Sequence, residues 1–165
     1  IIKLFSLYMN KILTIILLLI NFSVYGAASN SDSAQNIDNS DQVKIIYTKA
    51  EKYIYEKKFK KSLKLLRALT KREDLGDLRA DIYNLLGFSY RKINKPKLDK
   101  SFAAYMMALE IDPEHIGAHE YLGELYLMMG QKEKSQDMLL NLEVLAGVKS
   151  KEYLDLKFAI ENFQD

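Results

Sequence analysis

The sequence has no cysteine, no tryptophan, two prolines and seven glycines in 165 residues. The lack of cysteine excludes disulfides, thiolate metal sites, thiol catalysis and a lipid-modified cysteine anchor. The small numbers of glycine and proline argue against an all-β protein, whose many turns need both residues. Because 48% of the residues are hydrophobic and 28% are charged, the composition is that of a folded domain and not of a disordered chain.

The chain has little net charge, and its formal excess of +2 lies entirely in the first 28 residues. These contain Lys3 and Lys11 and no acidic residue, so the rest of the chain carries 22 basic and 22 acidic groups. Nucleic acid binding depends on a clear surplus of basic residues. We therefore expect no nucleic acid partner.

The first segment has the pattern of an export signal. Lys11 precedes an apolar run over residues 12–20, and small residues follow at 26–28. This order is typical of a secretory signal peptide. We predict a signal peptide over 1–28, cleaved after Gly26 or Ala28. Residues 1–8 are then an upstream extension if Met9, and not Ile1, is the true start.

The expected location is periplasmic or secreted, and a polar, flexible spacer is expected over 29–40. An alternative is that the first segment stays uncleaved and anchors the chain to the inner membrane. The apolar run is short for spanning a bilayer, because Asn21 interrupts it. Membrane contact is expected only through this segment.

The rest of the chain repeats a motif at a distance of 36 residues. The motif Tyr83-x-x-Leu86-Gly87-x-x-Tyr90 recurs as His119-x-x-Leu122-Gly123-x-x-Tyr126. Ser101-x-x-x-Tyr105-x-x-Ala108 follows the first copy, and Ser135-x-x-x-Leu139-x-x-Leu142 follows the second. We expect the glycines to let the backbones of paired helices approach closely.

These motifs resemble the tetratricopeptide repeat (TPR), whose consensus is W-x2-L-G-x2-Y…A-x3-F…P. The resemblance implies an all-α fold, a short right-handed solenoid of about three helix-turn-helix repeats over 41–165. The repeats are expected near 41–76, 80–113 and 114–147, and the first copy is degenerate. Tyr83 and His119 replace the usual Trp, and two extra residues per period are placed in the turn at 94–97.

A capping helix is expected over 150–163. Ser150 is its predicted N-cap, and its apolar face comprises Tyr153, Leu156, Ile160 and Phe163. The chain also resembles small exported bacterial TPR-containing proteins of unknown function. Some of these carry cysteines where this chain has residues 147–149, so no redox role is implied here.

The resemblance also predicts which side chains line a protein-binding groove. The first helix of each TPR pair lines the concave surface, and the offsets from the Leu-Gly pair select twelve residues: Tyr47, Glu51, Ile54, Tyr55, Asn84, Phe88, Arg91, Lys92, Glu120, Glu124, Leu127 and Met128. Aromatic residues, both charge signs and methionine suit peptide recognition. Alternatively, some of these residues pack against the neighbouring repeat. The set does not reproduce the carboxylate clamp of chaperone-binding TPR domains.

No catalytic set, cofactor site or metal site is predicted. The sequence lacks a nucleophile–base–orienter set and any phosphate-binding loop. His115 and His119 are four residues apart, but no further ligands accompany them. We expect His119 to pack between helices and His115 to be solvated, with a shared metal as the weaker alternative.

Charge is distributed unevenly along the repeats. A helix expected over 57–72 holds eight basic residues and no acid, whereas 110–131 holds five acids and no base. The plain interpretation is a solvated face, and the alternative is attraction of an oppositely charged partner or of anionic head groups. Overall, the sequence predicts a non-enzymatic adaptor that binds a protein or peptide, or alternatively a membrane-tethered structural or assembly factor.

Overall fold

The computed structural model describes residues 39–164. The predicted signal peptide, and the predicted spacer up to residue 38, lie outside the described residues. Within them, the secondary structure consists of seven α-helices and one short 3-10 helix, η1 (Gly76–Leu78). The α-helices are α2 (Asn39–Tyr55), α3 (Phe59–Leu69), α4 (Arg79–Lys92), α5 (Leu98–Ile111), α6 (Ile116–Met128), α7 (Lys132–Ala146) and α8 (Lys151–Glu161).

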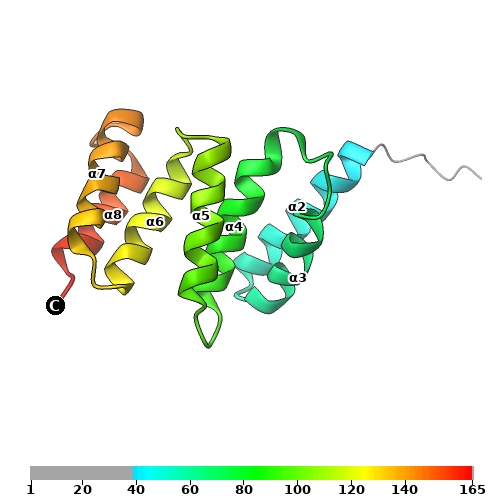
Figure 1. The fold of residues 1–165 in the computed structure, drawn as a ribbon, viewed down its shortest axis with the longest axis horizontal. Helices are drawn as coiled ribbons and strands as arrows, with labels where there is room; N and C mark the ends of the chain where they lie inside the picture. Colours follow the sequence, from blue (N-terminus) through cyan, green and yellow to red (C-terminus); the bar gives the residue numbers. More distant parts are fainter. Residues whose placement is uncertain (1–38, 165) are drawn as a thin grey trace, which may run out of the picture. The chain divides into compact units, whose positions relative to one another are not determined.

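The helices form three successive pairs, α2/α3, α4/α5 and α6/α7, followed by α8 (Figure 1). The first helices of the pairs contact one another in order, α2 with α4 and α4 with α6, and α6 then contacts α8. The second helices, α3, α5 and α7, make at most marginal contact with one another in this part of the chain. The fold is the expected all-α solenoid. None of the helices between residues 39 and 164 combines the length and apolar character that crossing a membrane requires.

Two of the three turns within the pairs contain a residue with a left-handed backbone. Lys57 has φ of 55°, and its neighbour Lys58 donates its backbone N–H to the carbonyl of Tyr53 at 2.7 Å. Gly130, between α6 and α7, has φ of 69°, which glycine adopts without a steric penalty. The expected basic helix over 57–72 is therefore shorter than predicted, because the turn at Lys57 delays its start to Phe59 and it ends at Leu69.

The hydrophobic core runs along the stack in three clusters. The first joins α2, α3 and α4 around Leu66, Leu69 and Ile82, all fully buried. The second gathers α5 and α6 residues around Tyr105, which is 0% exposed, and the third lies around Leu142 and Leu156 where α7 meets α8. Burial of each large apolar side chain contributes about 1.5–3 kcal/mol, so α8 is bound to the stack by its apolar face.

The glycines of the two Leu-Gly pairs make room for side chains, and not for a neighbouring backbone as expected. A Cβ placed on Gly87 would lie 2.6 Å from Cε1 of the Tyr105 ring. A Cβ placed on Gly123 would lie 2.5 Å from Cδ2 of Leu156, which belongs to α8 and not to the paired helix α7. Ser101 also donates its hydroxyl to the Gly87 carbonyl at 2.7 Å. Each glycine of the motif therefore leaves room for one bulky side chain to pack against it.

The N-terminus of α8 confirms the predicted cap. The Ser150 hydroxyl accepts the backbone N–H of Tyr153 at 3.2 Å, which satisfies one of the free donors of the first turn. Leu156 and Ile160 are buried, whereas Tyr153 and Phe163 are partly buried against the same cluster. This helix occupies the position that the first helix of a fourth pair would take.

We predict that Gly87→Ala lowers the free energy of unfolding by about 1–3 kcal/mol, as overpacking of a buried site does. Alanine is the better helix former by about 1 kcal/mol, so a destabilisation must come from the ring of Tyr105. Urea unfolding followed by circular dichroism measures the change.

Repeating Gly87→Ala in two variants of Tyr105 identifies the cause of the lost stability. The destabilisation by Gly87→Ala should persist in the Tyr105→Phe chain, which keeps the ring. It should shrink in the Tyr105→Leu chain, which lacks the ring. A Gly87→Ala chain that is as stable as the natural one would show that the ring does not need the glycine.

We also predict that Ser150→Ala destabilises the chain by about 1 kcal/mol, because the N–H of Tyr153 loses its acceptor. Ser150→Asp supplies another acceptor at the same place and should retain most of the stability. Thermal unfolding of the three chains compares them directly, and equal midpoints would contradict a role for the cap.

Candidate functional site

The candidate site is the surface formed by α2, α4, α6 and α8, which we call the first-helix face. The structure places the twelve predicted groove residues on the first three of these helices, at three depths. Those exposed to solvent are Glu51, Tyr55, Lys92 and Met128. Those half-buried are Tyr47, Ile54, Phe88 and Glu124, and those buried are Asn84, Arg91, Glu120 and Leu127. Partner contact stays a prediction for this set, and the four buried residues are the least accessible.

The centre of the face is a cluster around the guanidinium of Arg91, which is 3% exposed. Its Nη1 pairs with Oε2 of Glu124 on α6. Its Cζ lies 5.5 Å from the ring centroids of both Phe88 and Tyr121, and these two centroids are 4.9 Å apart. A guanidinium against aromatic faces is a favourable cation–π arrangement. These contacts brace α4 against α6.

Arg91 is buried more deeply than the sequence suggested. Its Nε and Nη2 are buried and have no hydrogen-bond partner among the described residues. Breaking a buried ion pair by removing one partner strands the other charge, at a cost of about 3–5 kcal/mol. Arg91 is therefore a poor residue to substitute in a binding experiment, because its loss would disturb the fold.

Glu120 is a buried carboxyl group on the same face, and only 6% of it is exposed. Burial, followed by the negative charge of Glu124, raises the pKa of Glu120 to about 7. On α8, Asp155 and Glu152 raise this pKa further, whereas Lys151 lowers it. Glu120 therefore changes its charge near neutral pH.

Two further acidic groups, Asp81 and Glu51, lie near Tyr47 of α2. Burial, followed by the charges of Asp81 and Glu51, raises the pKa of Tyr47. Lys151 is exposed and paired with Asp155 at 2.5 Å. Around Glu120, three further carboxyl groups, those of Glu124, Glu152 and Asp155, act against one basic group, that of Lys151. The four helices as a whole hold eight acidic and eight basic residues. The surplus of carboxyl groups is therefore local to the contact of α6 with α8.

Five residues of this site were not among the predicted groove residues: Asp81, Tyr121, Lys151, Glu152 and Asp155. Asp81 lies three residues before Asn84, on the same helical stripe as Phe88, so periodicity could have found it. Lys151, Glu152 and Asp155 belong to the predicted capping helix, and only the contact of α6 with α8 brings them near Glu120. Tyr121 adjoins the Leu-Gly pair and gave no separate signal.

The two histidines are both occupied by protein contacts. His115, expected to be solvated, is the N-cap of α6, and its side chain is 12% exposed. Its Nδ1 accepts the N–H of Ala118 at 3.0 Å, which leaves Nε2 to donate to Asp81 at 3.1 Å. His119 packs between helices as expected, and its Nε2 donates to the Pro113 carbonyl at 2.8 Å. Within residues 39–164, no group of three or more potential ligand side chains is placed to hold a metal ion.

Known proteins resemble this chain through the same repeat. Residues 104–137 match the family model described as tetratricopeptide repeat. The chain is 31% identical over 103 residues to tetratricopeptide repeat protein 37 of Xenopus laevis, covering 61% of this chain and 6% of that protein. It is 37% identical over 62 residues to the chloroplastic tetratricopeptide repeat domain-containing protein PYG7 of Arabidopsis thaliana, covering 38% of this chain and 19% of that protein. The chain thus spans only a small part of these relatives.

Solved structures share the fold at low sequence identity. The type III secretion chaperone SycD of Yersinia enterocolitica, solved with a peptide of the translocator YopD, superposes with a TM-score of 0.61 and 17% identity, covering 78% of this chain and 93% of SycD. A chain of the CopN–Scc3 complex superposes with a TM-score of 0.56 and 16% identity, covering 87% and 85% of the two chains. Residues 104–137 thus match the tetratricopeptide repeat, and the stack of helix pairs shares the fold of these solved structures.

Proposed function

We propose that this chain is a non-enzymatic interaction adaptor whose first-helix face binds a peptide or protein segment. The observation that carries the proposal is the continuous line of first helices from α2 to α8, which presents aromatic and charged side chains on one surface. Surfaces of this kind are the usual binding surfaces of helical repeat proteins. The peptide bound to SycD, a protein of similar fold, supports the same use here.

The charge of the face indicates the chemistry of the partner. The carboxyl groups gathered around Glu120, at the contact of α6 with α8, favour a segment with lysine or arginine side chains. Phe88, Tyr121 and the exposed Met128 offer apolar contact beside those charges, and methionine adapts its shape to different ligands. The partner we propose is therefore a basic segment that also carries apolar residues.

We propose that this adaptor works in the cell envelope, either free in the periplasm or secreted. The support is the basic, apolar and small-residue pattern of residues 1–28. The alternative, an assembly factor tethered to the inner membrane, requires the same segment to be retained. The mass of the mature protein separates the two, because cleavage after Gly26 or Ala28 removes the segment and an intact N-terminus retains it.

Binding should weaken when exposed carboxylates of the first-helix face are neutralised. The probe is a fluorescein-labelled peptide of alternating lysine and leucine, and fluorescence anisotropy measures its dissociation constant. We expect Glu51→Gln combined with Asp155→Asn to weaken binding by about three- to tenfold, since each partly exposed charge contributes up to about 1 kcal/mol.

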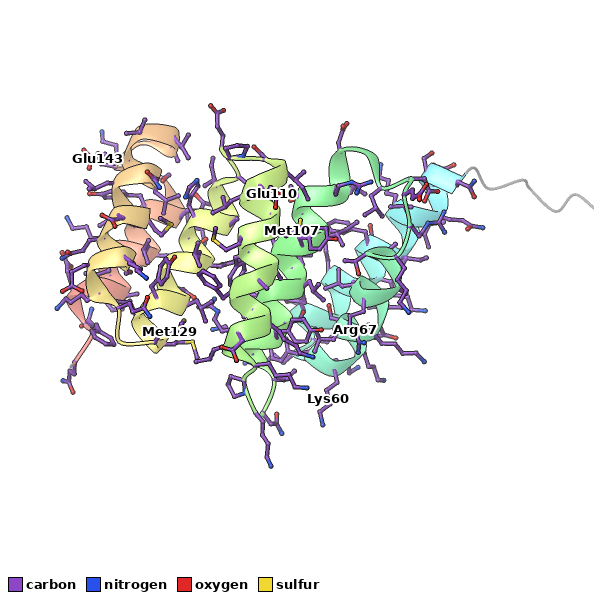
Figure 2. All side chains as sticks on the ribbon, viewed as in Figure 1. Lys60, Arg67, Met107, Glu110, Met129 and Glu143 are labelled. Atoms are coloured by element: carbon purple, nitrogen blue, oxygen red, sulfur yellow. The ribbon has the colours of Figure 1, made fainter. Side chains whose placement is uncertain are left out.

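The matched control removes two carboxylates from the second helices. Glu110 lies on α5 and Glu143 on α7, both exposed (Figure 2). Glu110→Gln combined with Glu143→Gln changes the net charge equally and should leave the affinity within about twofold. Equal weakening by the two pairs would mean that the peptide responds to net charge and not to this face.

Glu120 should make the stability of the chain depend on pH. Folding raises its pKa from 4.5 to about 7, so its stabilising contribution is complete below pH 4.5 and is lost as the pH rises through 7. Glu120→Gln stays neutral throughout. Its stability relative to the natural chain should therefore grow by about 1–3 kcal/mol between pH 5 and pH 8.

Urea unfolding at the two pH values measures this difference. Glu143→Gln, at an exposed site on α7, is the control and should show no comparable dependence. A Glu120→Gln difference that stays constant with pH would show that Glu120 titrates in the folded chain as it does in the unfolded one.

A further inference from the structure

A second surface lies away from the first-helix face, between α3 and the turn that joins α4 to α5. It is a groove of about 720 Å³, within the range of ligand-binding clefts. It exists because α3 and α5, unlike the first helices, make at most marginal contact in the described part of the chain. Figure 2 labels Lys60 and Arg67 on α3 beside this turn. We call this hollow the basic groove.

One wall of the basic groove is a single face of α3. Its lining positions recur at three- and four-residue spacing from Lys60 to Lys71, so they share one side of the helix. They extend for about 16 Å at 1.5 Å per residue. That length matches about five residues of an extended peptide.

The other wall of the groove is formed by the turn between α4 and α5, which is longer than the corresponding turn of the next repeat. The turn between α4 and α5 covers 93–97, whereas the turn between α6 and α7 covers only 129–131. The longer turn supplies Ile93, Asn94, Lys95 and Lys97 to the groove. The N–H of Lys97 donates to the Tyr90 carbonyl at 3.0 Å, which fixes the turn against α4. The two additional residues thus build a wall that the next repeat lacks.

The lining combines positive charge with an apolar surface. Six basic residues line the groove and no acidic residue does: Lys60, Lys64, Arg67, Lys71, Lys95 and Lys97. None of the ion pairs found among residues 39–164 uses any of the six. The apolar part comprises Leu63, Ala68, Tyr90 and Ile93. Unpaired like charges around a hollow repel one another, and an anionic occupant relieves that repulsion.

We propose that the basic groove binds an acidic peptide segment of a partner protein, one that carries a large apolar side chain among its carboxylates. The six basic groups match the carboxylates, and the apolar lining matches the inserted side chain. A nucleic acid strand would leave the aliphatic lining unused, and the balance of charge beyond residue 28 does not favour it. A bilayer surface would meet the rim and not fill the hollow.

The test uses the full chain and two labelled peptides of about ten residues. One contains glutamate with a central leucine and phenylalanine, and the other has serine at those two places and the same charge. Fluorescence anisotropy at about 50 mM salt, where screening is weak, measures both. We expect the first peptide to bind at least about tenfold more tightly, because burial of its two apolar side chains adds well over 1.4 kcal/mol.

Charge reversal at exposed positions locates the site. Lys64→Glu combined with Arg67→Glu should weaken binding of the first peptide by about tenfold or more, since both residues line the groove. Lys44→Glu combined with Lys49→Glu makes the same charge change at exposed positions of α2 and should alter affinity by no more than about twofold. Circular dichroism confirms that each chain is folded.

A steric variant tests the hollow without changing charge. Ala68 is exposed and lines the groove, so Ala68→Phe should fill it and reduce binding by about tenfold, a loss of roughly 1.4 kcal/mol. Ala103→Phe, at an exposed position of α5 outside the lining, is the control and should leave binding unchanged.

Four results would overturn the proposal. They are no binding of the first peptide, equal binding of the serine peptide, equal losses from the two charge-reversed pairs, and displacement of the peptide by vesicles with about one-third anionic lipid. The last would mean that the occupant is a lipid surface.

Discussion

The architecture depends on one steric constraint: a bulky side chain packs directly against the glycine of each Leu-Gly pair, where a Cβ would not fit. Tyr105 covers Gly87 and Leu156 covers Gly123, and a Cβ on either glycine would overlap the covering side chain. The first contact joins the helices of one pair, whereas the second joins α6 to α8. The same motif therefore sets the spacing both within a pair and between the last pair and the helix that ends the stack. The positions of the surface side chains follow from that spacing.

The stack separates a local group of carboxyl side chains from a basic groove. The first helices contact one another and bring carboxyl groups together around Arg91, which compensates part of their repulsion through Glu124. The second helices diverge, and the basic groove opens between α3 and the turn at 93–97. A nearly neutral folded region can thus attract cationic and anionic segments at different places. Neither surface needs a catalytic residue, and the histidines of α6 serve its N-cap and its packing.

The sequence predicted the fold better than it predicted the site. The recurring Leu-Gly motif, the apolar spacing of α8 and Ser150 at its N-cap are local patterns, and each has a direct structural consequence. The depth of the side chains was not predictable, because it depends on which helices meet. Arg91 and Glu120 occupy expected offsets but are buried by neighbours from α6 and α8. The solvated position expected for His115 was wrong, because its ring caps α6 and contacts Asp81 on α4.

The most direct test of the account is nuclear magnetic resonance of the isotope-labelled chain during titration with the lysine–leucine peptide. The account predicts that backbone amide shifts change chiefly on α2, α4, α6 and α8, with exposed residues such as Glu51, Lys92 and Met128 among the most affected. Shift changes concentrated on α3, α5 and α7 would contradict it, and so would the absence of any change at saturating peptide.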